Sequence, residues 1–184
     1  MNTQRHKVFV SYHHANDQYY REQFENLFSN TYDIMVSKSV QIGDIDPYLP
    51  AERVRQIIRD EYLRDTTVTV VLIGSETWKR KHVDWEIGAS IRNTQKNPRS
   101  GLIGILLPSY HNHYGIEYGK YNKCNIPPRL SDNIDCGFAK LYDWNTDPNI
   151  VQNWIHEAFT NRTKINPDNS YPNFSNNRTS NGWC

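Results

Sequence analysis

The stretch that most constrains the fold is the apolar run VTVVLI, from Val68 to Ile73. Its apolar residues do not alternate with polar ones, so neither face of an extended segment here can lie in water. A run of this kind, ended by Gly74 and Ser75, is typical of a strand buried on both sides, as in a parallel sheet. We therefore expect a central buried strand at these residues.

A helical segment from about His82 to Ile91 follows this strand. At about 100° per residue, one stripe of the helix can pack on the sheet, formed by Val83, Ile87, Ser90 and Ile91. The other side carries Trp78, His82, Trp85 and Ala89. Glu86 lies at the edge of the packing stripe, where a carboxylate is partly desolvated and costly to keep without a function. The alternative is a boundary residue paired with a nearby Lys or Arg.

Strands and helices alternate along most of the chain. Short apolar segments predict strands at residues 7–12, 33–36, 68–73, 102–107 and 138–142. Helices are expected after a cap at Asn16 or Asp17, from Pro50 to about Leu63, from about His82 to Ile91, and from Asp147-Pro148 onward. Residues 40–50 and 109–130 lack helical or strand periodicity, so we expect loops there, and long loops in small domains are often functional.

This alternation predicts an α/β fold with an open, mostly parallel, five-stranded sheet and helices on both faces. In a flavodoxin-like strand order, 2-1-3-4-5, ligands bind at the carboxyl ends of the first and third strands. Those ends are the polar cluster Ser11 to His14 and the pair Gly74-Ser75. The topology would therefore bring Glu86 and the first polar cluster to one crevice, which favours a functional role for this carboxylate.

The formal net charge is +1 and the basic residues are scattered, so a nucleic-acid-binding stripe is not indicated. The N-terminal segment lacks the apolar core of a signal peptide, and no apolar run is long enough to cross a membrane. The cysteines, Cys124, Cys136 and Cys184, show no C-x-x-C spacing and are expected to be free thiols. We therefore expect a cytoplasmic protein without a metal site.

Residues 1–162 are expected to form one domain, and residues 163–184 an Asn- and Ser-rich C-terminal tail. Two alternatives remain open for the tail. It is either disordered or an extended strap that packs on the domain through Tyr171, Phe174 and Trp183. No G-x-G-x-x-G or G-x-x-x-x-G-K-[ST] motif occurs in the chain, so phosphate binding by a glycine-rich loop is not supported.

Two motifs resemble those of TIR domains. Val8-Phe9-Val10-Ser11-Tyr12 is similar to the first TIR box, a strand that ends in Ser-Tyr. Ser75-x-x-Trp78 followed by Trp85-Glu86-Ile87 is similar to the TIR segment that carries the catalytic glutamate. With Asp84 before Trp85 and an Asn- and Tyr-rich later half, the chain most resembles the TIR-like proteins of the Thoeris antiphage system (the ThsB type), over roughly residues 5–160.

The resemblance implies a TIR-like fold and, for enzymatic members, cleavage of NAD at its nicotinamide–ribose bond. In Thoeris-type members the implied product is a cyclic ADP-ribose isomer, a second messenger that activates a separate antiphage effector. NAD is then the substrate, no bound cofactor or metal is needed, and self-association on activation is a further expectation. Glu86 matches the catalytic glutamate of the family.

Several further residues are candidates for substrate binding. Ser11 and Tyr12 end the first strand at the crevice, where the alternatives are capping or packing. The rings near Glu86 are candidates for contact with nicotinamide, and His13 and Asp44 lie on neighbouring loops, where solvated side chains are common. The full set comprises Ser11, Tyr12, His13, Asp44, Trp78, His82 and Trp85.

The competing interpretation is a TIR interaction module that acts by self-association without turnover. Glu86 and the aromatic residues beside it favour the enzyme, because an adaptor requires neither. A receiver domain would need an acidic cluster after the first strand and an Asp after the third. Those positions hold Ser-Tyr-His-His and Gly-Ser, which argues against a receiver.

Overall fold

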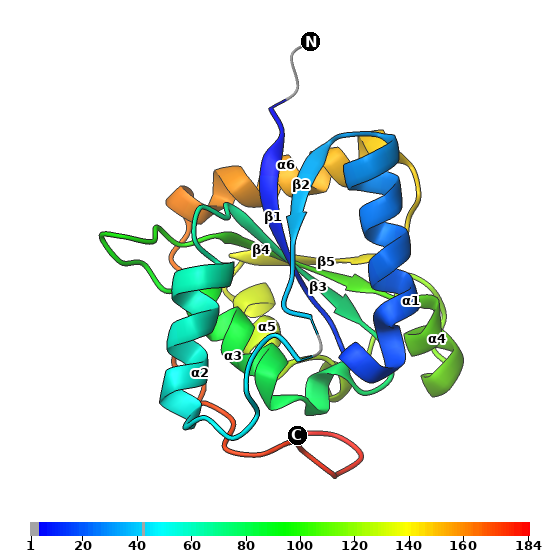
Figure 1. Ribbon diagram of the computed structural model, residues 1–184. Coiled ribbons are helices and arrows are strands. Elements are labelled where there is room, and N and C mark those ends of the chain that lie inside the picture. Colours follow the sequence, from blue (N-terminus) through cyan, green and yellow to red (C-terminus); the bar gives the residue numbers. More distant parts are fainter. Residues whose placement is uncertain (1–3, 42) are drawn as a thin grey trace.

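The computed structural model describes residues 4–41 and 43–184, in which five parallel strands form one sheet (Figure 1). The strand order is β2-β1-β3-β4-β5, as expected for a flavodoxin-like sheet. The strands are β1 (His6–Ser11), β2 (Met35–Lys38), β3 (Val68–Ile73), β4 (Gly101–Leu106) and β5 (Ala139–Asp143). All residues of β3 and β4 are buried. The predicted fold class and the central position of the VTVVLI strand are confirmed.

The strands are connected by helices. These are α1 (His14–Glu25), α2 (Ala51–Ile57), α3 (Lys81–Ser90), α4 (Pro108–Tyr114), α5 (Pro128–Asp135) and α6 (Pro148–Lys164). Two of them continue as wider π-helical turns, α1 through Asn26–Thr31 and α2 through Ile58–Tyr62, and short 3₁₀ turns occur at Thr77–Lys79 and Lys123–Asn125. The helix predicted from Pro50 to about Leu63 is thus present, with a change of winding in its second half.

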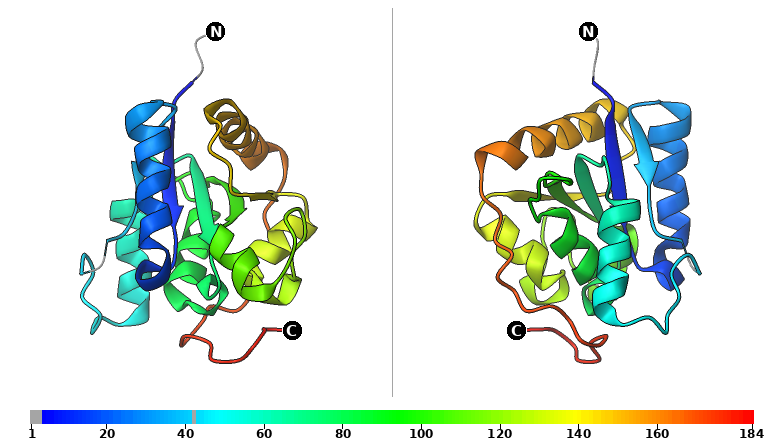
Figure 2. Two further views of the ribbon diagram at one scale, coloured as in Figure 1. Left: turned by 90° about the vertical axis from the view of Figure 1, so that its right-hand side faces the viewer. Right: turned by 60° about the vertical axis from the view of Figure 1, so that its left-hand side comes forward.

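The helices cover both faces of the sheet (Figure 2). On one face, α1 and α6 pack on β1, β3 and β4 through buried residues that include Phe24, Phe28, Val151 and Ile155. On the other face, the predicted stripe of α3 packs beside α5, and its Val83, Ile87 and Ile91 join one core with Leu130. The side of α3 that carries Trp85 packs instead with Phe9, Val40, Ile58 and Leu63.

The expectation of a long loop at residues 109–130 was wrong. Pro108 is the first residue of α4, a position where its missing N–H costs no hydrogen bond. The buried ring of His111 bonds to Ile116 O and to Asp143 Oδ1, at 3.0 and 2.9 Å, and so serves the core. A polar composition hid this short helix, because Tyr110 and His111 are buried through tertiary contacts that the sequence pattern does not show.

The expected cap of α1 was also wrong. His13 is the N-cap, and its Nδ1 accepts a hydrogen bond from Asn16 N at 3.0 Å. Asp17 instead points inward, where its carboxylate contacts Thr77 and Ser109. A side chain at Gly74 would collide with this carboxylate, at 2.4 Å from a Cβ, so the turn after β3 needs a residue without a side chain. Burial raises the pKa of Asp17 to about 6, against the effect of its hydroxyl partners.

The C-terminal tail follows an extended path from α6 along the outside of α5 and α3 (Figures 1 and 2). Phe174 is buried, and its backbone bonds to α3 at both ends: its N–H donates to Asp84 Oδ2, at 3.0 Å, and its C=O accepts from Trp85 Nε1, at 2.8 Å. Asn177 Oδ1 accepts from Lys81 N at 3.0 Å and thereby caps α3 from outside the helix. The tail therefore completes the surroundings of α3.

The expectation of free thiols was wrong for two of the cysteines. Cys124 and Cys184 form a disulfide that closes the tail onto the segment before α5, while Cys136 is free and exposed. Their Cα atoms lie 5.3 Å apart although 60 residues separate them in the sequence. Spacing alone could not reveal this proximity, because the path of the tail determines it. Because these two cysteines are paired, free thiols no longer support the expectation of a reducing compartment.

In the part of the chain that the structure describes, no helix is both long and apolar enough to cross a membrane.

Candidate active site

Glu86 lies on α3 at the carboxyl ends of β1 and β3, where the topology predicts a crevice. Glu86 is only 2% exposed. It is therefore more deeply buried than the edge position on the helical stripe predicted. The hydroxyl of Ser11, the last residue of β1, donates a hydrogen bond to Glu86 Oε2. This strand end and this helix therefore hold the carboxyl group between them.

Burial is the main influence on the charge of this carboxyl group. It raises the pKa of Glu86 to about 8, because the ionised form loses its hydration, and the hydrogen bond from Ser11 acts in the opposite direction. No basic side chain of the described residues forms an ion pair with Glu86. The interpretation of Glu86 as a paired boundary residue is therefore wrong. An unpaired buried carboxyl at a crevice is a feature of functional sites.

Glu86 faces a cavity of about 360 Å³, which we call the Glu86 cavity. Its walls come from the loop at residues 40–50, from α2 and from α3, with Ile45, Leu49 and Val54 opposite His82 and Trp85. Ser175 of the tail closes one side. A mostly apolar cavity with a few convergent polar groups is typical of small-molecule sites.

Two histidines also line this cavity and are held in their neutral form. Burial lowers the pKa of His82 to about 4, and the charge of His14 acts in the same direction. Burial likewise lowers the pKa of His14, followed by the effect of Arg21. His82 Nε2 donates to the carbonyl of Tyr12, at 3.1 Å, which orients the ring. Neither imidazole supplies a positive charge to the cavity at neutral pH.

The Trp85 ring forms a wall of the Glu86 cavity and is held in place by neighbouring groups. Its Nε1 donates a hydrogen bond to Phe174 O of the tail. The charged groups of Lys81 and Arg55 lie 5.3 and 5.4 Å from the centre of the ring. A ring fixed by such contacts is pre-organised for stacking against a planar ligand. Trp85 is thus the aromatic side chain best placed to contact a ligand beside Glu86.

The structure brings Ser11, His82 and Trp85 to Glu86 and places the other candidates elsewhere. The hydroxyl of Tyr12 is turned away to Gln18 Oε1, at 2.7 Å. Trp78 donates to Tyr114 OH, at 3.0 Å, and is absent from the walls of the cavity. These two side chains pack into the core around the site.

His13 and Asp44 are likewise not directed into the Glu86 cavity. His13 caps α1, its Nε2 is in contact with Arg80 Nε, and it is buried rather than solvated. Asp44 is exposed and accepts from Gln41 N of its own loop, at 2.8 Å. The neighbouring Asp46 lines the cavity instead.

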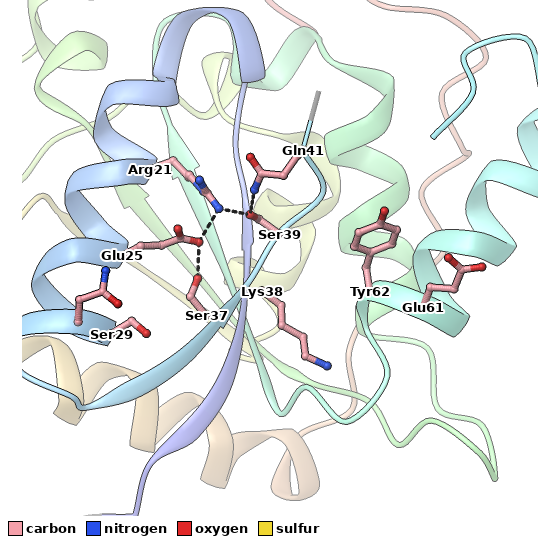
Figure 3. A pocket seen from close by; sticks show the side chains of 10 residues that line it. Arg21, Glu25, Ser29, Ser37, Lys38, Ser39, Gln41, Glu61 and Tyr62 are labelled. Carbon is pink, nitrogen blue, oxygen red and sulfur yellow. Dashed lines mark hydrogen bonds and ion pairs between the residues drawn. The ribbon is translucent and has the colours of Figure 1, made fainter. Parts of the chain in front are cut away.

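A separate polar cavity of about 410 Å³ lies beyond the loop, between α1, β2 and the end of α2 (Figure 3). Arg21 is central to it and bonds to Glu25 and to Ser39 Oγ, each at 2.8 Å. Ser39 in turn accepts from Gln41 Nε2, at 2.8 Å. Gln41 lines both cavities, so this network fixes the start of the loop that walls the Glu86 cavity.

The sequence contained a signal for some of the cavity residues that were not singled out, but not for all. Ile45 and Leu49 are apolar side chains in an otherwise polar loop, which indicates that part of the loop faces inward. Val54 belongs to the predicted inward face of α2. Ser175 had no signal, because only the path of the tail brings it to the cavity. Within residues 4–41 and 43–184, no group of three or more His, Cys, Asp or Glu side chains lies close enough together to bind a metal ion.

Residues 9–112 match the family described as Thoeris protein ThsB, TIR-like domain. The chain belongs to this family. The match covers more than half of the chain and includes the first TIR-like motif from Phe9 onward, the whole of the second motif and the whole of α3. Glu86 therefore lies within the matched part of this ThsB-type TIR-like domain. No curated protein matches the chain.

Proposed function

We propose that this protein cleaves NAD at the nicotinamide–ribose bond and that Glu86 is its catalytic residue. The observation that carries the proposal is the unpaired, buried carboxyl of Glu86, which faces a cavity beside the fixed ring of Trp85. The ThsB-type TIR-like family supports it, since NAD cleavage is the activity that the TIR resemblance implies.

A single carboxylate is sufficient for this chemistry. Glycosidases commonly use a second carboxyl group as an acid that protonates the leaving group. Nicotinamide leaves from a pyridinium cation and takes the bonding electron pair as a neutral molecule, so it needs no acid. The remaining requirement is to stabilise an oxocarbenium-like ribose, which the negative charge of Glu86 can provide in a cavity of low polarity.

The raised pKa of Glu86 couples substrate binding to proton release. With a pKa of about 8, the carboxyl of the empty site is mostly protonated at pH 7. A pyridinium ring in the cavity brings a positive charge close to Glu86 and favours its ionised form. The carboxylate therefore becomes charged when the cationic substrate is bound.

We further propose that the product is a cyclic ADP-ribose isomer. A hydroxyl of the adenosine ribose would attack the anomeric carbon and form the new C–O bond, while its proton passes to the carboxylate of Glu86 and then to water. NAD is thereby converted to the cyclic product, nicotinamide and one proton. Cyclisation requires that water be kept out, and Ile45 and Leu49 supply an apolar wall for this. The product would act as a second messenger for a separate antiphage effector.

The first experiment is incubation of NAD with extract from cells that express the protein, with and without phage infection, beside the Glu86→Gln variant. Glu117→Gln is the matched control, because Glu117 is an exposed residue that pairs with Lys120 and does not line the cavity. We expect a species with the mass of cyclised ADP-ribose from wild type and control only. If wild type and Glu86→Gln both give no product in infected extract, the protein acts as an interaction module instead.

A second experiment tests the role of the loop. Leu49→Ser introduces a hydroxyl into the apolar wall and lets water reach the anomeric carbon, so linear ADP-ribose should increase at the expense of the cyclic product. Tyr48→Ser, at the fully exposed neighbouring position, is the control. An unchanged ratio of cyclic to linear product in Leu49→Ser would show that this wall does not exclude water.

A further inference from the structure

Beside the Glu86 cavity lies a third cavity, of about 270 Å³, whose lining is rich in arginine. Arg55 and Arg59 come from α2 and its π-helical continuation, Arg92 follows α3, and Arg129 comes from α5. Trp85 lines both this cavity and the Glu86 cavity, so its indole is a wall that the two share. We call this cavity the arginine pocket.

One of the four guanidinium groups is fully used within the protein. Arg129 donates to both oxygens of Asp84, at 2.9 and 3.3 Å, and to Asn169 Oδ1 and Asn173 Oδ1 of the tail, at 2.7 and 3.1 Å. The Arg129 side chain is 2% exposed, and Asp84 balances its charge. Arg129 therefore builds the floor of the pocket and leaves its other three arginines for an incoming ligand.

The remaining three arginines have little negative charge opposite them. Arg55 pairs with Glu52, at 2.7 Å, but the carboxylate of Glu52 is 77% exposed at the rim. The only acidic partner of Arg59 within the described residues is its sequence neighbour Asp60, through one contact of 3.3 Å. In the same part of the chain, Arg92 forms no ion pair.

The charges of these three arginines all act on the carboxylate of Glu52, which lines the same pocket and is the anion that a bound phosphate would have to displace from Arg55. The hydrogen bond and charge of Arg55 lower the pKa of Glu52, and the charges of Arg59 and Arg92 act on it in the same direction. Arg55 and Arg59 are also held by their surroundings, with side chains only 26% and 22% exposed. Partly covered guanidinium groups, each with a planar fork of N–H donors, form a site for a multivalent anion.

The chemistry of the two cavities is complementary. The Glu86 cavity contains the acidic Glu86 and Asp46, two neutral histidines, and Lys81 as the cation among its described lining residues. Phosphates are poorly accommodated there. The arginine pocket offers planar donor groups that match phosphate oxygens in pairs, beside the indole of Trp85. We propose that Arg55, Arg59 and Arg92 bind the phosphates of a nucleotide in the arginine pocket.

Two sources of these phosphates are distinguishable. One is the pyrophosphate of the same dinucleotide whose nicotinamide riboside lies at Glu86, with the molecule passing over Trp85, and this version rests on the proposed function. The other is a separate nucleotide that occupies the arginine pocket while the Glu86 cavity turns over its own substrate. Both use the same phosphate chemistry, and binding by itself requires no catalytic activity.

The first arm of the test is equilibrium binding of ADP and of adenosine to wild type, Arg59→Gln and Arg92→Gln. Arg53→Gln is the control, because Arg53 lies on α2, carries the same charge, is exposed and lines neither cavity. We expect ADP to bind more tightly than adenosine, and each pocket variant to weaken ADP binding roughly tenfold, as for loss of a charge-assisted hydrogen bond. Arg53→Gln should change it by less than about twofold. Arg92 lies on an exposed segment, so its replacement leaves the packed core intact.

Equal binding of ADP and adenosine to wild type, or equal weakening by Arg53→Gln, would overturn the proposal. The second arm measures NAD turnover in the presence of ADP. Competitive inhibition by ADP, with KM for NAD raised and kcat unchanged in Arg59→Gln, assigns the pocket to the pyrophosphate of the substrate. Inhibition or activation that is not competitive assigns it to a separate nucleotide. A protein that binds ADP through these arginines but turns over no NAD would refute the proposed function and leave the anion site standing.

Discussion

Ser11 and Glu86 are 75 residues apart in the sequence, yet the hydroxyl of Ser11 donates directly to the carboxyl group of Glu86. The contact joins the end of β1 to α3, the two elements that carry the TIR-like motifs. Because Ser11 pairs with Val71 of the neighbouring central strand, its position is fixed by the sheet. The sheet thus orients the carboxyl group on which the proposed chemistry depends.

The buried carboxyl of Glu86 should lower stability at high pH. Its pKa is about 8 in the folded protein and 4.5 without the fold, so between these values the folded state holds a proton that the unfolded state has lost. The contribution of Glu86 to stability therefore falls as pH rises from 4.5 to 8, whereas the contribution of the buried neutral His82 rises with pH, so the prediction concerns the difference between wild type and a Glu86 variant. The shift corresponds to an upper limit of roughly 5 kcal/mol, at about 1.4 kcal/mol per pKa unit. Glu86→Gln, which stays neutral, should gain stability over wild type across this range. Urea unfolding at pH 5 and pH 8.5 measures the difference, and an equal effect at both pH values would contradict it.

The activity of the free enzyme should depend on the same titration. If the charged form of Glu86 is required, kcat/KM for NAD rises with pH below about 8 and levels off above it. The pH dependence of kcat should level off at a lower pH, because the bound pyridinium favours the carboxylate. Initial rates from pH 6 to 9.5 would test both expectations. A kcat/KM that is flat below pH 8 would mean that Glu86 is already ionised in the free protein.

Removal of the Ser11 hydroxyl should move this profile. Its hydrogen bond favours the charged form of Glu86, so Ser11→Ala should raise the pKa of Glu86 further and shift the kcat/KM profile to higher pH. A hydrogen bond to a charged group contributes about 1.5–3 kcal/mol, which corresponds to a shift of roughly one to two pH units. Ser29→Ala, on the π-helical continuation of α1 and outside the lining of the Glu86 cavity, is the control. Equal loss of activity at every pH would indicate a merely structural role for Ser11.

The disulfide should stabilise the tail on α3. Closing a loop of 60 residues between Cys124 and Cys184 contributes about 4 kcal/mol by the loop-entropy model. Cys124→Ser should therefore lower the free energy of unfolding and speed amide exchange at Phe174 and Arg178, which bond to the α3 region. Cys136→Ser is the matched control, because Cys136 is free and exposed. If both variants unfold at the same urea concentration under oxidising conditions, the disulfide does not contribute to stability.

The buried pair of Arg129 and Asp84 should matter far more than a surface pair. Arg129→Gln leaves the carboxylate of Asp84 buried without its ionic partner, which costs about 3–5 kcal/mol. Arg5→Gln removes the exposed pair with Asp33, where a loss of at most about 1 kcal/mol is expected. Urea unfolding of both variants tests the contrast. Similar small losses would show that water or a rearranged tail replaces Arg129.

The sequence was sufficient for features that depend on local patterns. The run at Val68–Ile73, apolar except for Thr69, can only be a buried strand or a buried helix, and its length and flanking Gly74 distinguish the two. The stripe of α3 predicted which side packs on the sheet, and the expected strand order placed Glu86 near the end of the first strand. The two TIR-like motifs were sufficient to indicate the family. Each is a short local segment that can be recognised in the sequence without knowledge of the tertiary structure.

Tertiary structure alone decided the features that depend on distances between remote segments. The relative positions of α2, α3 and the tail decide three such features. They determine whether Glu86 is paired, whether Cys124 meets Cys184, and which of the nearby rings faces the cavity. Four arginines from three helical regions form one pocket only after packing. Local periodicity determines the face on which a side chain lies, whereas burial and charge pairing depend on what the rest of the chain places opposite it.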